Sequence, residues 1–457
     1  MNHRLSRRRF LANSAAAGLG LGTLGFPHVR AAEATGKLRV LSIGVVGTVG
    51  GLDRQQIANH PDAEIVGLCD VDSNTLAQAA NDHPKAFTCR DYREAFDKHV
   101  DKFDAVIVAT PDHTHGPIML TAFALDKHVY GQKPLVHQLE ELSMMEKAIA
   151  AKPQLVTQLG NQRMAHPGRR AAVEILRREM LGKAIKAYAW VGSPNDTGFF
   201  NFNRVHRKNS EIPKSLDYKL WLGPAAEMDY YDDLAPIKWR SWWDFGTNGL
   251  GDWGCHLLDV FMFAYDELQS PFSVKTDCEP DKTGVFHPHP CKSVTKYKVS
   301  GKMFANEEFP IYYNDSGIAP TAEELGIPEP VKGAEKSVVV CEGGTLVLSA
   351  DGGLSIWRDG KSTPGLRMPG LPRKWPSLNH WHAWVDNCLG RDAELRTPFK
   401  DAVRITEPCL LAVKAGRFPG KELLWDKSKL AFTNDEEATR TVVRRQYREG
   451  FAPPKVG

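Results

Sequence analysis

Residues 37–53 read KLRVLSIGVVGTVGGLD, an apolar run that ends in a cluster of glycines. A strand that passes through a glycine-rich turn into a helix is how a dinucleotide-binding fold places a helix N-terminus against a pyrophosphate. The spacing departs from G-x-G-x-x-G, because with Gly47 as the first glycine Val49 takes the second position and Leu52 the third. A side chain at the second position crowds the pyrophosphate, so either the turn is rebuilt around Gly50 or binding is weakened. The candidate cofactor contacts in this turn are Gly47, Thr48, Val49 and Gly50.

Apolar stretches of strand length alternate with helical patterns from residue 37 to residue 160. This alternation predicts a parallel, doubly wound Rossmann sheet over residues 37–160, whose usual ligand is a nucleotide. The expected strands are 38–46, 64–69, 86–88, 105–109, 128–131 and 155–159, and the expected helices are 73–81, 92–96, 116–124 and 139–151.

Asp70 ends the second expected strand, about twenty residues after the glycine turn. A carboxylate there accepts hydrogen bonds from the adenosine ribose and repels a 2′-phosphate, which favours NAD over NADP. The alternative is that Asp70 or Asp72 caps the helix that begins near Ser73.

The pattern changes after Gly160, where strands follow one another without intervening helices. Residues 161–457 are therefore expected to form a second, α+β domain with a mainly antiparallel open sheet, which makes the whole chain α/β in class. Its expected strands are 184–191, 293–299, 337–341 and 345–349, and its expected helices are 169–180, 381–389 and 402–415.

Two segments at expected strand ends, ATPDHTH at 109–115 and GQKP at 131–134, carry a more specific signal. They resemble the Gfo/Idh/MocA family of oxidoreductases, which shows A-T-P/N-x-x-H and E-K-P at these places. The resemblance covers nearly the whole chain after the first 36 residues, and it implies that Lys133 faces the cofactor and is catalytic. Gln132 stands where the family usually has Glu, so the charge beside Lys133 differs. The cofactor contacts implied here are Thr110, Pro111, His115, Gln132 and Lys133.

Residues 249–259 read GLGDWGCHLLD and place Asp252, His256 and Asp259 at i, i+4 and i+7, which is one face of a helix. Residues 260–265 are almost wholly apolar, so an imidazole and carboxylates beside them need partners or a function. The resemblance implies a function, because Asp252 and His256 match the family's D-x-x-x-H pair. Two alternatives stay open: Asp252 caps the helix, or the three side chains bind a metal, although we predict none.

The chemistry of a secondary alcohol suits these residue types. His256 would take the hydroxyl proton while hydride leaves the same carbon, and Lys133 would stabilise the developing alkoxide. Asp252 would orient the pair or contact a neighbouring hydroxyl. After the sixth expected strand, Asn161 could also reach the cleft, with a solvated loop as the alternative. The expected substrate contacts are Gln162, Arg163, His166 and Asp259.

These observations predict an NAD-dependent oxidoreductase that acts on a sugar or polyol, with tightly bound and internally recycled cofactor. A second hypothesis is a glycoside hydrolase that uses transient oxidation, and a third is a secreted sugar-binding protein without cofactor. The segment 249–252 lacks the His-Gly-Leu-Gly pattern of the hydrolases, and Lys133, Asp252 and His256 are all present, which favours the oxidoreductase.

The N-terminus predicts export. Residues 6–11 read SRRRFL, an apolar run follows at 15–26, and Ala31 and Ala32 come next, so residues 1–33 are expected to be a twin-arginine signal for the periplasm. Without the five arginines of residues 1–31 the chain has 53 basic and 55 acidic side chains, which argues against a nucleic-acid partner. Cys278 and Cys291 are candidates for a disulfide or two thiols. We expect no membrane span and a homo-oligomer, dimer or tetramer, formed through the open sheet.

Overall fold

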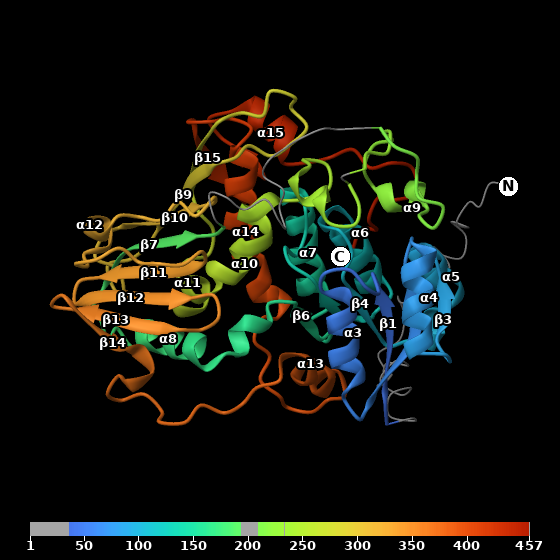
Figure 1. Ribbon diagram of the computed structural model, residues 1–457, viewed down its shortest axis with the longest axis horizontal. Coiled ribbons are helices and arrows are strands. Elements are labelled where there is room, and N and C mark those ends of the chain that lie inside the picture. The colour runs from blue at the N-terminus through green and yellow to red at the C-terminus, as the bar shows by residue number, and fades with distance from the viewer. Residues whose placement is uncertain (1–35, 193–208, 233, 457) are drawn as a thin grey trace, which may run out of the picture.

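The computed structural model describes residues 36–192, 209–232 and 234–456. The predicted export signal lies outside them. Two sheets build the fold, one on each side of Figure 1, and helices α10 (Asn248–Leu257) and α14 (Phe399–Ala415) lie between them. The predicted α/β class is confirmed.

The N-terminal half is a six-stranded parallel sheet with helices on both faces. Its strands β1 and β4 are buried almost throughout, as expected of a parallel sheet covered on both faces. In spatial order the strands are β3 (Phe87–Cys89), β2 (Ala63–Cys69), β1 (Leu38–Ile43), β4 (Ala105–Val108), β5 (His128–Gly131) and β6 (Thr157–Leu159). The helices are α3 (Gly50–Ala58), α4 (Ser73–Asp82), α5 (Tyr92–Lys98), α6 (Asp112–Ala124) and α7 (Leu139–Ala151).

The second half is a ten-stranded sheet that is antiparallel except where β7 and β10 pair. In spatial order its strands are β14 (Lys361–Pro364), β13 (Leu354–Arg358), β12 (Gly344–Ser349), β11 (Lys336–Cys341), β7 (Ala184–Trp190), β10 (Glu308–Asn314), β9 (Cys291–Lys298), β8 (Ser273–Cys278), β15 (Glu422–Asp426) and β16 (Ala431–Phe432). The remaining α-helices are α8 (Pro167–Arg177), α9 (Tyr218–Leu222), α11 (Asp259–Ala264), α12 (Ala322–Leu325), α13 (His380–Cys388) and α15 (Glu436–Val442).

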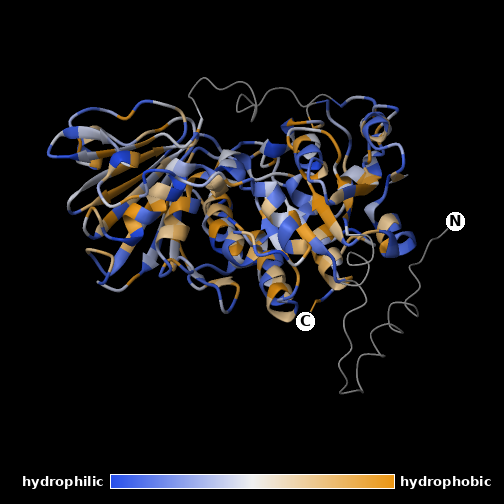
Figure 2. Ribbon diagram, turned by 90° about the horizontal axis from the view of Figure 1, so that it is seen from below, coloured by the Kyte–Doolittle hydropathy of each residue, from blue (hydrophilic) through white to orange (hydrophobic). Residues whose placement is uncertain are grey.

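Alternation along β11 gives the second sheet two apolar faces. Val339 and Cys341 join the core under the helices, whereas Val338 and Val340 join a smaller cluster with Leu325 on the other face. Figure 2 shows hydrophobic residues concentrated along the strands of both halves.

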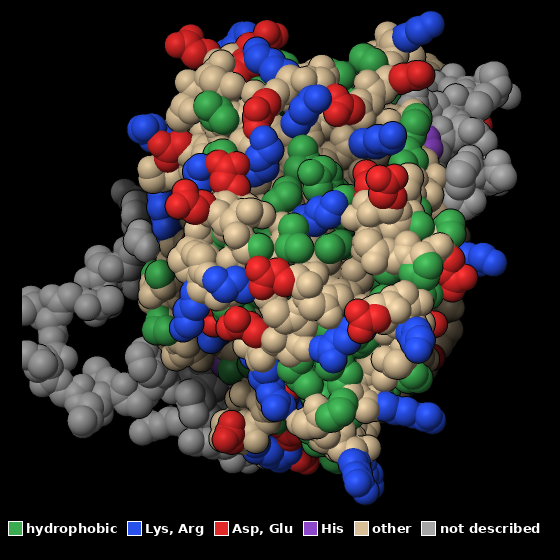
Figure 3. All heavy atoms as spheres, turned by 90° about the vertical axis from the view of Figure 1, so that its left-hand side faces the viewer, with side chains coloured by type: hydrophobic (Ala, Val, Ile, Leu, Met, Phe, Trp, Pro, Cys, Tyr) green, Lys and Arg blue, Asp and Glu red, His purple; other side chains and the backbone are tan. Residues whose placement is uncertain are grey.

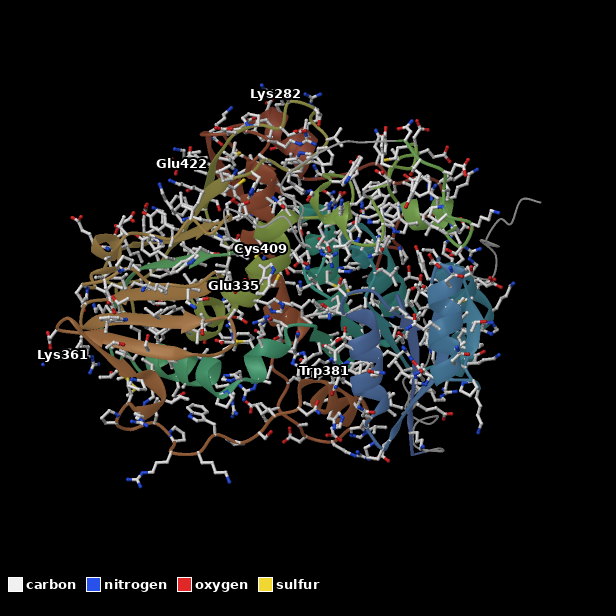
Figure 4. The ribbon with its side chains drawn as sticks, in the orientation of Figure 1. Lys282, Glu335, Lys361, Trp381, Cys409 and Glu422 are labelled. Carbon is white, nitrogen blue, oxygen red and sulfur yellow. The ribbon has the colours of Figure 1, made fainter. Side chains whose placement is uncertain are left out.

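Segments from the C-terminal part of the chain return to the parallel sheet. Helix α13 packs on α3, and α14 packs on α7 and on α10. Gly254 allows the closest approach of α10 to α14, because a Cβ there would lie 2.4 Å from the Sγ of Cys409, which Figure 4 labels. The catalytic candidates on α10 are thereby held against the cofactor-binding half.

The surface and the thiols add three observations. Basic and acidic side chains are interspersed on the face that Figure 3 shows. Cys278 and Cys291 are directly opposite each other on β8 and β9, and no disulfide joins them. Within the described ranges no helix has both the length and the apolar character to cross a membrane.

Candidate active site

The turn between β1 and α3 carries three glycines at the positions that demand them. Gly44 and Gly47 have φ of +79° and +63°, and a Cβ on Gly50 would lie 2.3 Å from the carbonyl oxygen of Gly44. These are the roles of a tight turn, an open approach to the pyrophosphate, and close packing of helix on strand. The predicted register beginning at Gly47 is therefore wrong: the pattern is G-x-x-G-x-x-G from Gly44, and Leu52 is 42% exposed.

The carboxylate of Asp70 lines the cleft at the end of β2. It accepts hydrogen bonds from the backbone N–H groups of Val45, at 3.1 Å, and Asp72, at 3.0 Å. The N-cap of α4 is Asp72, whose side chain accepts from the N–H groups of Asn74 and Thr75. Asp70 is thus not the cap, and its contact with the ribose stays a prediction.

The ends of β4 and β5 are tied together by His115. Its Nδ1 lies 2.8 Å from the carbonyl oxygen of Pro134, and its Nε2 lies 2.7 Å from that of Thr110. Thr110, Pro111 and His115 all line the cleft. A neutral imidazole carries one N–H, so His115 can donate to only one of these two carbonyl oxygens at a time, and its cofactor contact stays a prediction.

Lys133 and Asp252 both line the same cleft and meet there. The Nζ of Lys133 lies 2.8 Å from Oδ1 of Asp252, and Nε of Arg240 lies 3.5 Å from that oxygen. Burial alone would raise the pKa of Asp252, but the charges of Lys133 and Arg240 outweigh it and hold that pKa below its usual range. Asp252 is therefore an ionised carboxylate between two cations.

His256 lies one turn after Asp252 on α10 and is oriented by Asn161. The Nδ2 of Asn161 donates to the carbonyl oxygen of Cys255, at 2.8 Å, and to Asp259, at 2.9 Å, which leaves its Oδ1 to accept from Nδ1 of His256. The Nε2 of His256 then carries the lone pair of a base. Burial, together with the positive charges of Lys133 and Arg163, lowers the pKa of His256 well below its ordinary value, so the ring is neutral.

Two predicted substrate contacts are instead part of the support beneath His256. Asn161 and Asp259 are fully buried, and Asp259 forms an ion pair with Arg169, whose side chain is equally inaccessible. The predicted substrate contact of Asp259 is wrong, because Asp259 begins a separate helix after α10 ends at Leu257 and its carboxylate is buried in the core. Asp252, His256 and Asp259 do not point to a common position, so they do not form a metal site.

The other predicted substrate contacts fall in and after a short turn that follows β6. The guanidinium of Arg163 lies 4.9 Å from the ring centroid of Trp253, whose edge faces His256, so Arg163 is beside the base. Gln162 is partly exposed in the same turn. His166 is exposed, and its Nδ1 accepts a hydrogen bond from the N–H of Gly168. His166 is therefore the N-cap of α8.

A strap made of residues 209–232 and 234–245, together with the tail 445–451, lies across the cleft. The carbonyl oxygen of Ser215 accepts from the N–H of Ser73 at 3.0 Å and from the side chain of Arg90 at 2.8 Å. The tail joins this strap through Arg448, which donates from its N–H to Pro224 and from its Nε to Gly223. The strap residues that line the cleft include Leu216, Leu220, Trp221, Trp239, Arg240 and Phe451.

Sequence reasoning missed the strap, Arg240 and a buried carboxylate, Asp53, that contacts Gln132. Arg240 lies in an irregular aromatic stretch without periodicity, so no pattern marks it. Asp53 stands in the first turn of the helix after the glycine turn, and because the polar residues Arg54 and Gln55 follow it, no local pattern marks it as buried.

Comparison with known proteins agrees with this geometry. A model described as the oxidoreductase family, NAD-binding Rossmann fold, matches residues 39–159, and a model of the oxidoreductase family, C-terminal alpha/beta domain, matches residues 170–298. Fold and site thus define an NAD-binding oxidoreductase. The chain belongs to the Gfo/Idh/MocA family, as the strand-end motifs indicated.

The curated relatives are distant and partial. An inositol 2-dehydrogenase of Rubrobacter xylanophilus is 25% identical over 154 residues, which are 33% of this chain and 43% of the relative. A glucose-6-phosphate 3-dehydrogenase of Bacillus subtilis is 27% identical over 230 residues, 49% of this chain and 53% of the relative. The chain spans about half the length of these relatives.

A solved structure shows the same fold. An inositol dehydrogenase homologue of Azotobacter vinelandii, in complex with NADH and myo-inositol, has a TM-score of 0.58 at 15% identity, over 85% of this chain and 98% of that chain. The residues of this chain fit NAD, because Gly47 leaves the turn open, Gly50 lets α3 pack on β1, and Asp70 offers a carboxylate at the ribose end. NAD is the cofactor of this fold.

Proposed function

We propose that this protein oxidises a secondary alcohol of a sugar or polyol, using NAD that stays bound and is recycled internally. The observation that carries the proposal is the ion pair of Lys133 and Asp252 in the lining of the cofactor cleft, with neutral His256 one helical turn after Asp252. Bound NAD supplies hydride transfer.

The residues divide the rest of the reaction among them. The Nε2 of His256 accepts the hydroxyl proton while the carbon loses hydride, which yields the ketone. The ammonium group of Lys133 stabilises the negative charge that develops on the substrate oxygen. Asp252 holds Lys133 in place, and because it stays ionised it can also accept a hydrogen bond from a neighbouring hydroxyl. In the reverse direction protonated His256 returns the proton.

The substrate class rests on two supports. The relatives are named for dehydrogenation of inositol and of glucose 6-phosphate, both polyhydroxylated rings. Trp253 contacts His256, and Arg163 lies over the ring of Trp253, so an aromatic ring and a cation lie near the base, which suits a ring with several hydroxyl groups.

The strap supports a cofactor that is retained between turnovers. It adds a layer of protein over a cleft that already contains Asp70 and the glycine turn, and its hydrogen bonds to Ser73 and Arg90 hold it at the ribose end. Release of NAD then requires these bonds to break, which slows dissociation. A retained cofactor must be regenerated in place, so each oxidation is followed by reduction of a second substrate.

The test uses natively exported protein. We expect denaturation to release about one NAD per chain, and addition of a polyol such as myo-inositol to the intact protein to raise absorbance at the NADH band. A second, oxidised sugar should then reverse that absorbance. Protein that contains no nucleotide and binds none on addition contradicts the proposal and favours a sugar-binding role.

We also propose that the chain reaches the periplasm by the twin-arginine route, because its first residues carry SRRRFL before an apolar run. Replacing Arg7 and Arg8 by Lys should leave the protein in the cytoplasm, as judged by cell fractionation. Unchanged periplasmic recovery would contradict this route.

We further propose a homo-oligomer formed through the outer face of the ten-stranded sheet. Ile185, Tyr312 and Trp357 are partly buried apolar side chains at the rim of the cluster on that face. Light scattering after gel filtration should give the mass of a dimer or tetramer, and the mass of a single chain would contradict it.

A further inference from the structure

Gln132, the residue that departs from the family motif, is bound to a buried carboxylate from another element. Its Nε2 donates to Oδ2 of Asp53 at 2.6 Å. Asp53 lies in the first turn of α3 with 1% of its surface exposed. It also accepts from Nε1 of Trp381 on α13, at 2.8 Å, and from the hydroxyl of Tyr130 on β5, at 3.4 Å; Figure 4 labels Trp381 beside α3.

All three partners of Asp53 present donors, which is the environment of a carboxylate that carries charge. Burial raises the pKa of Asp53 to about 6, against the lowering effect of these hydrogen bonds and of the charge of Lys133. The remaining titratable groups around it are the hydroxyl of Tyr130 and, beyond that ring, His380, whose pKa burial lowers to about 4. Lys133 is therefore the cation that Asp53 faces at neutral pH.

The amide of Gln132 connects Asp53 to the backbone of the catalytic lysine. Because its Nε2 is used by Asp53, its Oε1 faces the backbone N–H of Lys133, at 3.4 Å. The space for the amide is provided by Gly160, where a Cβ would lie 2.2 Å from Nε2 of Gln132. The side chain at position 132 is thus held in one place, between Asp53 and the backbone N–H of Lys133.

We propose that Asp53 is a positioning residue of the active site, which supplies from α3 the carboxylate that the family motif carries at position 132. It acts on Lys133 through Gln132 and through its charge. Because α3 begins at the cofactor turn, Asp53 also connects the pyrophosphate-binding end of that helix to the catalytic lysine. The inference rests on the proposed function of Lys133, but the position of the carboxylate can be tested without a substrate.

The experiment exchanges the two side chains in the purified holoprotein. Gln132→Glu places two carboxyl groups 2.6 Å apart, and Asp53→Asn removes the charge, so each single variant should lower turnover at least tenfold. The double variant Asp53→Asn with Gln132→Glu restores one carboxylate and one amide and should recover to within about threefold of wild type. Asp104→Asn, which alters a buried carboxylate of the same sheet paired with Arg39, is the matched control for destabilisation.

Two pH profiles separate positioning from mere structural support. NADH affinity and turnover of wild type should change across pH 5–7, and Asp53→Asn should lose that change while the double variant regains it. If Asp53 had only a structural role, the double variant would recover the melting temperature but not the pH dependence. Wild-type turnover of Gln132→Glu, or a double variant no better than the worse single variant, would overturn the proposal. If no polyol is oxidised, the NADH profile still decides on Asp53, and the failure belongs to the proposed function.

Discussion

Arg448→Ala should release the strap and shorten the time for which NAD is retained. The side chain of Arg448 donates to the carbonyl oxygens of Gly223, at 3.0 Å, and Lys219, and it stacks over the ring of Phe451 at 4.6 Å. A hydrogen bond to a charged group contributes about 1.5–3 kcal/mol, and the lower end applies to this partly exposed side chain, so the two bonds amount to about 3 kcal/mol. If opening of the strap limits release, that loss speeds dissociation roughly a hundredfold.

The assay dialyses freshly purified holoprotein and follows the remaining bound nucleotide by chromatography after denaturation. Arg444→Ala is the matched control, because Arg444 directly precedes the tail but pairs with Glu140 at the surface, where an ion pair is worth about 0–1 kcal/mol. A folded Arg448→Ala protein that keeps NAD as long as wild type would refute the idea that the strap controls release. Loss of NAD from wild type within minutes would refute the retained cofactor itself.

Four other predictions follow from the site. Lys133→Met and His256→Asn should each lower turnover by about a hundred- to ten-thousand-fold while the protein stays folded, and wild-type rates in either variant would contradict its catalytic role. Asp70→Ser should weaken NAD binding and narrow the gap to NADP, as measured by titrating nucleotide-free protein. Arg169→Met leaves a buried carboxylate without its cation and should cost about 3–5 kcal/mol of unfolding free energy in denaturant titrations. The pKa of Asp53 is raised from 3.8 to about 6, so the folded state holds this proton more tightly, and wild type should lose about 3 kcal/mol of stability as pH rises from 4 to above 6; Asp53→Asn should not show this loss.

The parts of the fold with strong local signals could be predicted from the sequence. The strand His128–Gly131 and the helix Leu139–Ala151 have the predicted bounds, because both are compact apolar patterns between polar turns. The pair of Lys133 and Asp252 was also predicted, and the two residues are in contact. That prediction came from motifs whose spacing is preserved, although the two residues are 119 positions apart in the sequence, as the difference of their numbers shows.

What could not be predicted depends on contacts between distant segments. The hydrogen bond between Asp53 on α3 and Gln132, which follows β5, joins residues that lie 79 positions apart, and no local pattern around either residue indicates the other. The burial of Asp259 depends on a helix break at Leu258, which an uninterrupted i, i+4, i+7 spacing conceals. The glycine register was misjudged because two residues, not one, lie between Gly44 and Gly47. The pattern therefore starts at Gly44, one residue earlier than G-x-G spacing would place it.

The composition of the strap also sets an order of events during synthesis. Residues 445–451 are translated after every other wall of the cofactor cleft, so the cleft remains uncovered on that side while the preceding chain folds. The cleft is open on that side during this interval and is covered once Arg448 and Phe451 have docked. Under the proposed retention of NAD, nucleotide that enters before the tail docks is enclosed when the tail folds over it.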